Sequence, residues 1–302
     1  MANTRFAYVR LYEQADSLLP NTFFVIRIDG KGFHKFSTSH NFDKPNDERA
    51  LRLMNDAATR VVNGKELMGD CILAFGESDE YSFVFKRRCN LHGRRASKLV
   101  SLVTSLFSST YVFLWPIYFP NSQLELDNLP VFDGRIVQYP TETEVRDYLR
   151  WRQADTHINN LYNTCFWTLV QRGGLSTNEA TKRLEGTISS QKQELLFSQF
   201  GINYNELPDM YKRGSLVVWQ QQPQQDDNGA SEQSQQMEAN NNQLKGPDSA
   251  PIISQTLLQH SQAGPSKLKL RKPQRQVVVV HEDLLADAWW QPGGRGHTLL
   301  AD

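Results

Sequence analysis

The chain is poor in cysteine, in long hydrophobic runs and in net charge. Its 302 residues include three cysteines, Cys71, Cys89 and Cys165, and no C-x-x-C pair. This excludes a disulfide framework and a zinc knuckle, and it predicts a reduced intracellular environment. Mean hydropathy is −0.54, and we read no segment as the ~20-residue apolar run of a membrane-spanning helix. The 33 basic and 33 acidic residues balance, which argues against non-specific binding to polyanions.

Aromatic residues are absent between Gln220 and Trp289, and residues 220–251 include nine Gln and four Asn. Such a segment buries too little apolar surface to offset the entropy of ordering it, so we expect a disordered insertion over 220–275. We expect a catalytic domain over 1–140 and a helical and C-terminal core region over 141–219. A returning segment and tail over 276–302 would dock a strand and a short helix on the core.

The first 140 residues follow the order β-α-β-β-α-β. We expect strands at 22–29, 71–76, 80–87 and 134–140, helices at 45–64 and 94–115, and a helical region over 142–200. This order predicts an α+β, ferredoxin-like fold, in which both helices cover one face of an antiparallel sheet. Strands one and three are antiparallel neighbours in that topology. The end of the first strand therefore lies beside the start of the third.

Carboxylates stand at both of these strand ends. Asp29 closes the first strand, and Asp79 and Glu80 open the third. Adjacent carboxylates repel one another unless a cation lies between them, and Mg²⁺ prefers oxygen ligands together with substrate phosphates. The loop 30–34, Gly-Lys-Gly-Phe-His, supplies two glycines and two basic side chains that favour an anion. The pattern predicts a metal–triphosphate site at the sheet edge.

Two further polar clusters allow either a structural or a functional interpretation. Basic residues at 86–88, 92, 94, 95 and 98 run into the second expected helix, where phosphate binding and a solvated face are equally open. The segment 157–163, His-Ile-Asn-Asn-Leu-Tyr-Asn, places three asparagines within five positions of a helix. They form a buried hydrogen-bond network or contact a polar ligand such as RNA, and composition favours the network.

Several long motifs together resemble one family, the eukaryotic tRNA-histidine guanylyltransferases. They cover nearly all of residues 1–219 and include RIDGKGFHKF, HNFDKPND, ESDEYSFVFKR, YLRWRQADTHINNLYN and MYKRGSLVVW. The resemblance implies a polymerase-like palm domain that adds a guanosine to the 5′ end of tRNA-His. ATP would adenylylate the tRNA 5′-phosphate, the 3′-hydroxyl of GTP would attack it, and pyrophosphate would then be removed.

The resemblance also implies roles for individual residues. Asp29 and Asp79 would be the catalytic ligands of two Mg²⁺ ions, with the Gly30 carbonyl as a further ligand and Glu80 as a supporting acid. The nucleotide triphosphate would be held by residues of two segments, namely Asp29, Gly30, Lys31, Gly32, Phe33, His34, Ser78 and Asp79. Candidates for the second triphosphate or for tRNA are Lys44, Asn46, Arg95, Lys98, His157 and Asn163. Family members are usually homotetramers.

Two rival functions remain at this point. A palm-type nucleotide cyclase would use the same acids, but its hairpin resembles G-G-D/E-E-F, whereas this chain has Gly-Glu-Ser-Asp-Glu at 76–80. A non-catalytic RNA-recognition module shares the βαββαβ order and would present Tyr81, Phe83 and Phe85 for base stacking. We expect a cytoplasmic protein, while the basic stretch 268–275 leaves nuclear import open.

Overall fold

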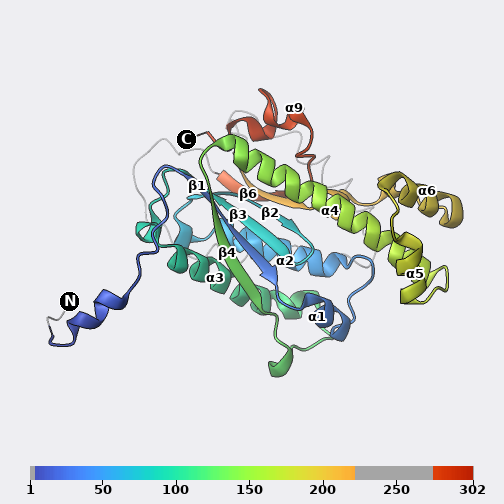
Figure 1. Cartoon of the computed structure of the whole chain (residues 1–302), viewed down its shortest axis with the longest axis horizontal. Helices are drawn as coiled ribbons and strands as arrows, with labels where there is room; N and C mark the ends of the chain where they lie inside the picture. The colour runs from blue at the N-terminus through green and yellow to red at the C-terminus, as the bar shows by residue number, and fades with distance from the viewer. Residues whose placement is uncertain (1–3, 222–274, 302) are drawn as a thin grey trace, which may run out of the picture. The chain divides into compact units, whose positions relative to one another are not determined.

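The chain forms a central six-stranded sheet with strand order β4-β1-β3-β2-β5-β6. Figure 1 shows the computed structural model, which describes residues 4–221 and 275–301. The pairs β1–β3, β1–β4, β2–β3 and β2–β5 are antiparallel. The order β4-β1-β3-β2 is that of the ferredoxin-like unit, so the predicted fold is confirmed. The strands are β1 (Phe23–Gly30), β2 (Cys71–Glu77), β3 (Glu80–Phe85), β4 (Phe132–Tyr139), β5 (Ser215–Gln221) and β6 (Arg275–Val280).

Helices cover both faces of this sheet. The two expected helices of the palm unit are α2 (Glu48–Val62) and α3 (Ala96–Tyr118), and the helical region contains α4 (Glu142–Gln171), α5 (Thr177–Leu184) and α6 (Ser189–Phe200). Three elements were not expected from the sequence, namely the short α1 (Phe33–Ser39), α7 (Asp209–Arg213) and β5. The expected strand and helix of the returning segment are β6 and α9 (Asp287–Trp290). The expected insertion over 220–275 lies almost entirely outside the described residues.

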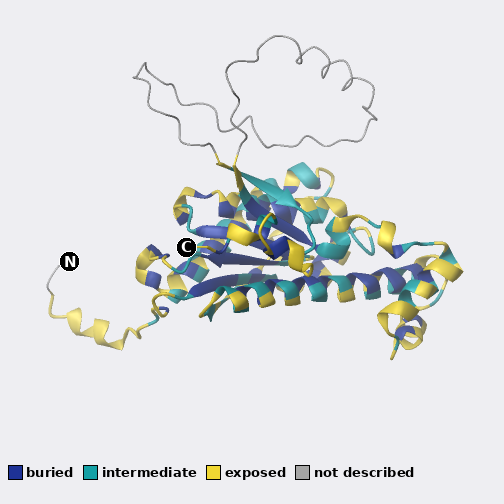
Figure 2. Cartoon of the chain, turned by 90° about the horizontal axis from the view of Figure 1, so that it is seen from above, coloured by how far each residue is buried: buried dark blue, intermediate teal, exposed yellow. Residues whose placement is uncertain are grey.

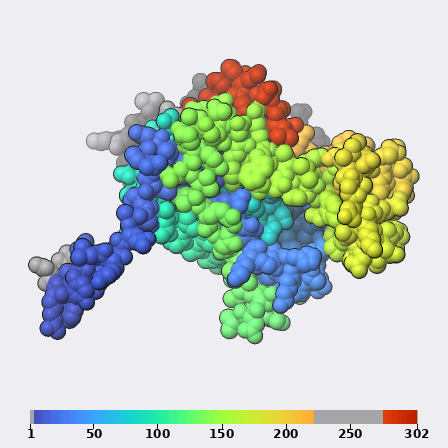
Figure 3. Space-filling view, in the orientation of Figure 1, coloured from blue at the N-terminus to red at the C-terminus, as the bar shows by residue number. Residues whose placement is uncertain are grey.

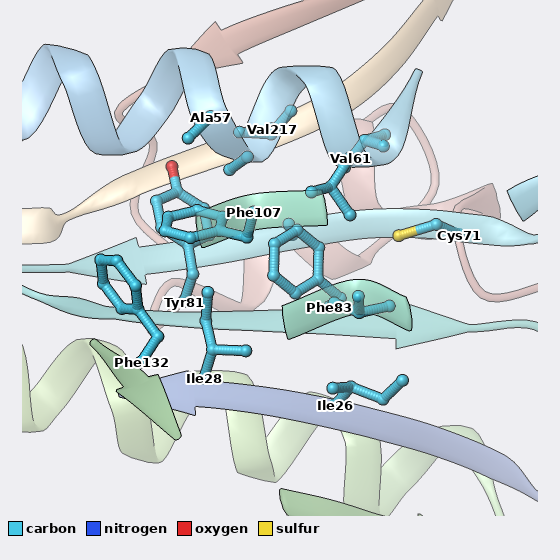
Figure 4. Packing of buried hydrophobic residues seen from close by; sticks show 14 of the residues in the cluster. Ile26, Ile28, Ala57, Val61, Cys71, Tyr81, Phe83, Phe107, Phe132 and Val217 are labelled. Atoms are coloured by element: carbon cyan, nitrogen blue, oxygen red, sulfur yellow. The ribbon is translucent and has the colours of Figure 1, made fainter. Parts of the chain in front are cut away.

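One face of the sheet packs against α2 and α3. Alternate residues of a strand point to the same face, so Ile26 and Ile28 of β1 lie beside Tyr81 and Phe83 of β3. Phe107 of α3 packs onto them (Figure 4). The Tyr81 hydroxyl donates a 2.7 Å hydrogen bond to Asn55 Oδ1 of α2. Contacts of Tyr81 with α2 and α3 therefore hold the β2–β3 hairpin on this face of the sheet.

The opposite face packs against α4 and the returning segment. Val25 and Val84 lie there with Leu149 of α4 and Leu284 and Trp290 of the C-terminal segment. The buried stripe of α4 runs along the side that faces the sheet (Figure 2). The helix starts at a capping box in which Thr141 and Glu144 bond each other's backbone N–H groups. From this start α4 packs across the sheet, and polar side chains of the helix reach the tip of the β2–β3 hairpin.

Helix α3 corrects one expectation from composition. By length and hydropathy, this helix alone among the described residues could cross a membrane, with a mean hydropathy of 1.4 over an 18-residue window. Five of its side chains, four residues apart from Leu99 to Trp115, are buried against the sheet and α2. Packing in the core accounts for an apolar face of this kind, so the property by itself is weak evidence for a membrane span.

Candidate functional site

The end of β1 and the tip of the β2–β3 hairpin meet at one edge of the sheet. Asp29 is directly opposite Glu80 in the β1–β3 register. The Gly30 N–H donates a 3.1 Å hydrogen bond to the Asp79 carbonyl oxygen. Only Ser78 and Asp79 connect the paired residues Glu77 and Glu80, and Ser78 has a left-handed φ of 49°. This pairing confirms that the end of β1 lies beside the hairpin tip, as predicted. The two-residue turn leaves the tip little conformational freedom.

A cleft of about 710 Å³ opens above these acids. Its walls come from the segment after β1, the start of α2, the hairpin tip, α4 and α7. In Figure 3 the blue N-terminal third and the green α4 lie on the same face of the molecule. The residues predicted for the site that line this cleft are Asp29, Phe33, His34, Lys44, Asn46, Ser78, Asp79, Glu80 and Asn163. The remaining predicted residues lie outside its lining.

Burial and like charge perturb the acids of the cleft. The pKa of Asp79 is raised to about 6, mainly by burial and also by the negative charges of Asp29 and Glu80, against hydrogen bonds that favour ionisation. Burial likewise raises the pKa of Glu77 to about 7, with Glu80 and Asp155 adding to the rise and Thr156 and Arg152 opposing it. Two carboxylates that resist ionisation together are stabilised by a cation between them.

The donor set of this edge fits Mg²⁺. Asp29 and Asp79 both line the cleft, and Mg²⁺ in proteins commonly takes one or two carboxylates and completes its shell with water and substrate phosphates. Within residues 4–221 and 275–301, no three His, Cys, Asp or Glu side chains cluster tightly enough to hold a metal by themselves. A metal here would thus depend on the bound triphosphate for part of its coordination.

The glycine-rich loop after β1 is shaped by its packing. A Cβ on Gly30 would overlap the ring of Phe33, so only glycine fits between β1 and α1. Two backbone N–H groups of this loop are used within the fold, since Gly30 bonds Asp79 and Lys31 donates to the Val131 carbonyl. Lys31 and Gly32 are exposed and lie beside the cleft lining rather than in it. An anion bound here would therefore meet the segment from Gly32 onward.

Polar residues on the far wall of the cleft form two separate hydrogen-bonded groups. Lys44 Nζ donates to Ser37 Oγ at 2.8 Å, and burial lowers its pKa. Asn46 Nδ2 donates to Asn160 Oδ1 at 3.0 Å, and Asn160 Nδ2 donates to the Tyr204 hydroxyl at 3.0 Å. Asn160 thus belongs to the structural network expected from composition, whereas Asn163 is exposed at the cleft.

Three other predicted residues lie away from the cleft. Arg95 and Lys98 are at the start of α3, where the neighbouring Arg94 donates to the Thr22 carbonyl just before β1. This is the opposite end of β1 from Asp29, about 23 Å away at ~3.3 Å per residue. Within one chain they therefore do not join Lys44 and Asn46 in a single triphosphate site. The His157 ring packs edge-on against Tyr204, 5.4 Å between centroids, outside the cleft lining.

Two charged residues of the cleft were not predicted from the sequence. Arg152 and Asp155 of α4 lie beside Glu77 and Glu80 beneath the hairpin tip. A signal was present in the sequence: Arg152 follows Val145 and Leu149 along the buried stripe of α4. An arginine on such a stripe needs a buried partner, because an unpaired buried charge is costly.

The third strand is unsuited to base stacking. Tyr81, Phe83 and Phe85 have exposed fractions of 1%, 0% and 0% because α2 and α3 cover them. An RNA-recognition module presents the corresponding aromatic residues to solvent. That rival interpretation is therefore wrong for this chain.

Comparison with known proteins gives a consistent family assignment. Residues 6–140 match the family profile described as tRNAHis guanylyltransferase, and residues 143–286 match the Thg1 C terminal domain. A tRNA(His) guanylyltransferase of Eremothecium gossypii is 57% identical over 217 residues, which is 72% of this chain and 91% of that protein. The Neurospora crassa protein of the same name is 44% identical and covers 96% of this chain and 94% of its own length.

Solved structures agree with the sequence matches. The Saccharomyces cerevisiae tRNA(His) guanylyltransferase superposes with a TM-score of 0.68 at 53% identity, covering 71% of this chain and 93% of that one. A bacterial Thg1-like protein in complex with ATP shares the fold, with a TM-score of 0.57 at 24% identity over 70% and 85% of the two chains. This chain therefore belongs to the tRNA(His) guanylyltransferase family of nucleotidyltransferases.

Proposed function

We propose that this chain adds a guanosine to the 5′ end of tRNA-His at the cleft above Asp29 and Asp79. ATP first reacts with the tRNA 5′-monophosphate, which forms a 5′–5′ adenylylated end and releases pyrophosphate. The 3′-hydroxyl of GTP then attacks the activated tRNA phosphate and expels AMP. Hydrolysis finally removes pyrophosphate from the added guanosine.

The residues of the cleft divide this work between them. Asp29 and Asp79, with the Gly30 carbonyl, would hold two Mg²⁺ ions, and the segment from Gly32 to His34 with Ser78 would orient the triphosphate. When bound, such ions lower the pKa of an attacking hydroxyl and neutralise charge on the leaving group. Lys44 and Asn46 on the far wall would contact a second triphosphate. Asn163, exposed at the cleft, would contact the tRNA.

The observation that carries this proposal is the arrangement of Asp29 and Asp79. Asp29 lies at the end of β1 and Asp79 in the turn between β2 and β3; the Gly30–Asp79 hydrogen bond joins the two segments, and both acids line a cleft large enough for a nucleotide. A tetrameric assembly, a cytoplasmic location and a contact of His157 with tRNA also remain predictions.

The direct test is incubation of purified protein with 5′-monophosphorylated tRNA-His transcript, Mg²⁺, ATP and labelled GTP. We expect label at the RNA 5′ end that depends on ATP and disappears in Asp29→Asn and Asp79→Asn. A matched control is Asp70→Asn, since Asp70 precedes β2 at the opposite end of the same hairpin. Conversion of GTP to a cyclic product without RNA would instead support the cyclase.

A further inference from the structure

Two arginines contact a group of five carboxylates that line the cleft at the sheet edge and on the adjoining α4. The carboxylates are Asp29, Glu77, Asp79, Glu80 and Asp155. Arg27 of β1 places Nε 3.5 Å from Glu80 Oε2. Arg152 of α4 has a side chain only 6% exposed and reaches three of the acids. The positive charges are thus too few to pair every acid, and their placement decides which acids stay unpaired.

Arg152 contacts the acids on both sides of the hairpin tip. Its Nη1 lies 3.4 Å from Glu77 Oε1 and 3.2 Å from each carboxylate oxygen of Glu80. Its Nη2 donates to Asp155 Oδ2 at 2.9 Å. Glu77 and Glu80 are the last cross-strand pair before the turn that carries Asp79. One guanidinium therefore bridges the two strand ends from which Asp79 projects.

The guanidinium is itself held in one orientation. Its central carbon lies 3.8 Å from the ring centroid of Trp151, which covers it as a cation–π partner. Trp151 is 56% exposed, so the ring separates the ion pairs from water on that side. Its two terminal nitrogens are occupied by three carboxylates. A planar fork can satisfy acids in several directions, which a lysine ammonium cannot do from the same position.

Asp29 and Asp79 are the acids left over. Among the residues that the structure describes, neither forms an ion pair with a lysine or arginine, whereas Glu77, Glu80 and Asp155 all do. A carboxylate engaged by a guanidinium is a poorer ligand for a cation, because binding the cation would cost it that partner. The cluster thus has an excess of negative charge concentrated on two residues.

We propose that Arg152 is a positioning residue that fixes the base of the Asp79 turn and keeps Glu77 and Glu80 from taking the cation in place of Asp29 and Asp79. Glu80 then has a structural task, as a partner of Arg27 and Arg152, rather than a ligand's task. This inference rests on the proposed role of Asp29 and Asp79 in holding the cation.

The experiment compares Arg152→Gln and Arg152→Lys with the full-length wild-type chain. Guanosine addition gives kcat and KM for GTP, and calorimetric titration with MnCl₂ gives cation affinity without turnover. The matched control is Arg150→Gln, since Arg150 lies on the same helix but pairs with Asp287 of the C-terminal segment. We expect the control to retain wild-type kcat and Mn²⁺ affinity.

Removing the charge should separate affinity from turnover. In Arg152→Gln, Glu77 loses its ion-pair partner and Glu80 keeps only Arg27, so both become freer to bind the cation. We therefore expect Mn²⁺ to bind at least as tightly, up to ~10-fold tighter, while kcat falls at least ~30-fold. KM for GTP should change less than ~3-fold, because the triphosphate loop is untouched. A folded Arg152→Gln variant in which cation affinity and turnover fall together would overturn the proposal.

Arg152→Lys keeps the charge and tests the fork alone, including the case in which Arg152→Gln does not fold. We expect wild-type Mn²⁺ affinity and a kcat about 10-fold lower, since one ammonium cannot hold Glu77, Glu80 and Asp155 at once. Wild-type turnover in this variant would refute the positioning role. If the wild-type chain itself added no guanosine, the proposed function would fail, and Mn²⁺ affinities would still judge the partition of the carboxylates.

Discussion

Asp79 should cost the protein stability in the absence of a divalent cation. Its pKa of about 6 stands above the ordinary value of 3.8 because the carboxylate is buried beside Asp29. At about 1.36 kcal/mol per pH unit, the difference corresponds to about 3 kcal/mol, and partial access of water at the cleft reduces this to about 2 kcal/mol. Asp79→Asn removes the charge and keeps the shape. The metal-free variant should therefore be more stable than wild type at pH 8.

The sign of the pH dependence follows from the raised pKa. Above about pH 6 the folded wild type carries the buried charge and the whole penalty applies. As the pH falls from 6 towards 3.8, the folded state takes up a proton before the unfolded state does, so the penalty disappears. The difference in melting temperature between variant and wild type should be about 4–8 °C at pH 8 and should close near pH 4.

Differential scanning fluorimetry in EDTA at pH 8, 6 and 4.5 measures this difference. The control is Asp127→Asn, an exposed acid in the loop before β4, which should change the melting temperature by less than about 2 °C at each pH. Added Mg²⁺ should stabilise wild type more than Asp79→Asn. Equal or lower stability of the variant at pH 8 would refute the reasoning, because the carboxylate would then be stabilised by contacts rather than strained.

Two further substitutions test how the hairpin and the C-terminal segment are held. Gly76→Ala should lower the free energy of unfolding by about 2–3 kcal/mol, because the new Cβ would overlap the buried ring of Tyr81. Urea unfolding measures this loss, and an unchanged midpoint would show that the Tyr81 ring can move. Gln153→Ala removes a 2.9 Å hydrogen bond to the Glu282 carbonyl and a 2.6 Å hydrogen bond from the Leu284 N–H. The loss should weaken the docking of the C-terminal segment by about 2–3 kcal/mol, so limited proteolysis should cleave this segment faster than in wild type. Unaltered cleavage would mean that apolar packing alone holds it.

Much of the palm unit follows from local sequence. The strand β1 is a continuous apolar run with Asp29 at its end, and the β2–β3 hairpin has a short polar connection between two apolar runs. Periodicity and turn residues are local properties, so the order β-α-β-β-α-β and the meeting of Asp29 with Asp79 could be predicted. Family motifs added the identities of further site residues. Helix α2 begins at Glu48 rather than at the expected residue 45, because Asp47 caps its first turn.

Tertiary structure alone decided which charges meet. Arg152 is more than 70 residues from Glu77 and Glu80 in sequence, and only the crossing of α4 over the sheet brings it beneath the hairpin. The same long-range packing buried the aromatic face of β3 and separated Arg95 and Lys98 from Lys44. Sequence patterns record which residues prefer burial, whereas ion pairing depends on distances between segments that no local pattern encodes. The sequence therefore determined the chain's fold class and its two principal acids, and the packing determined how those acids are left free.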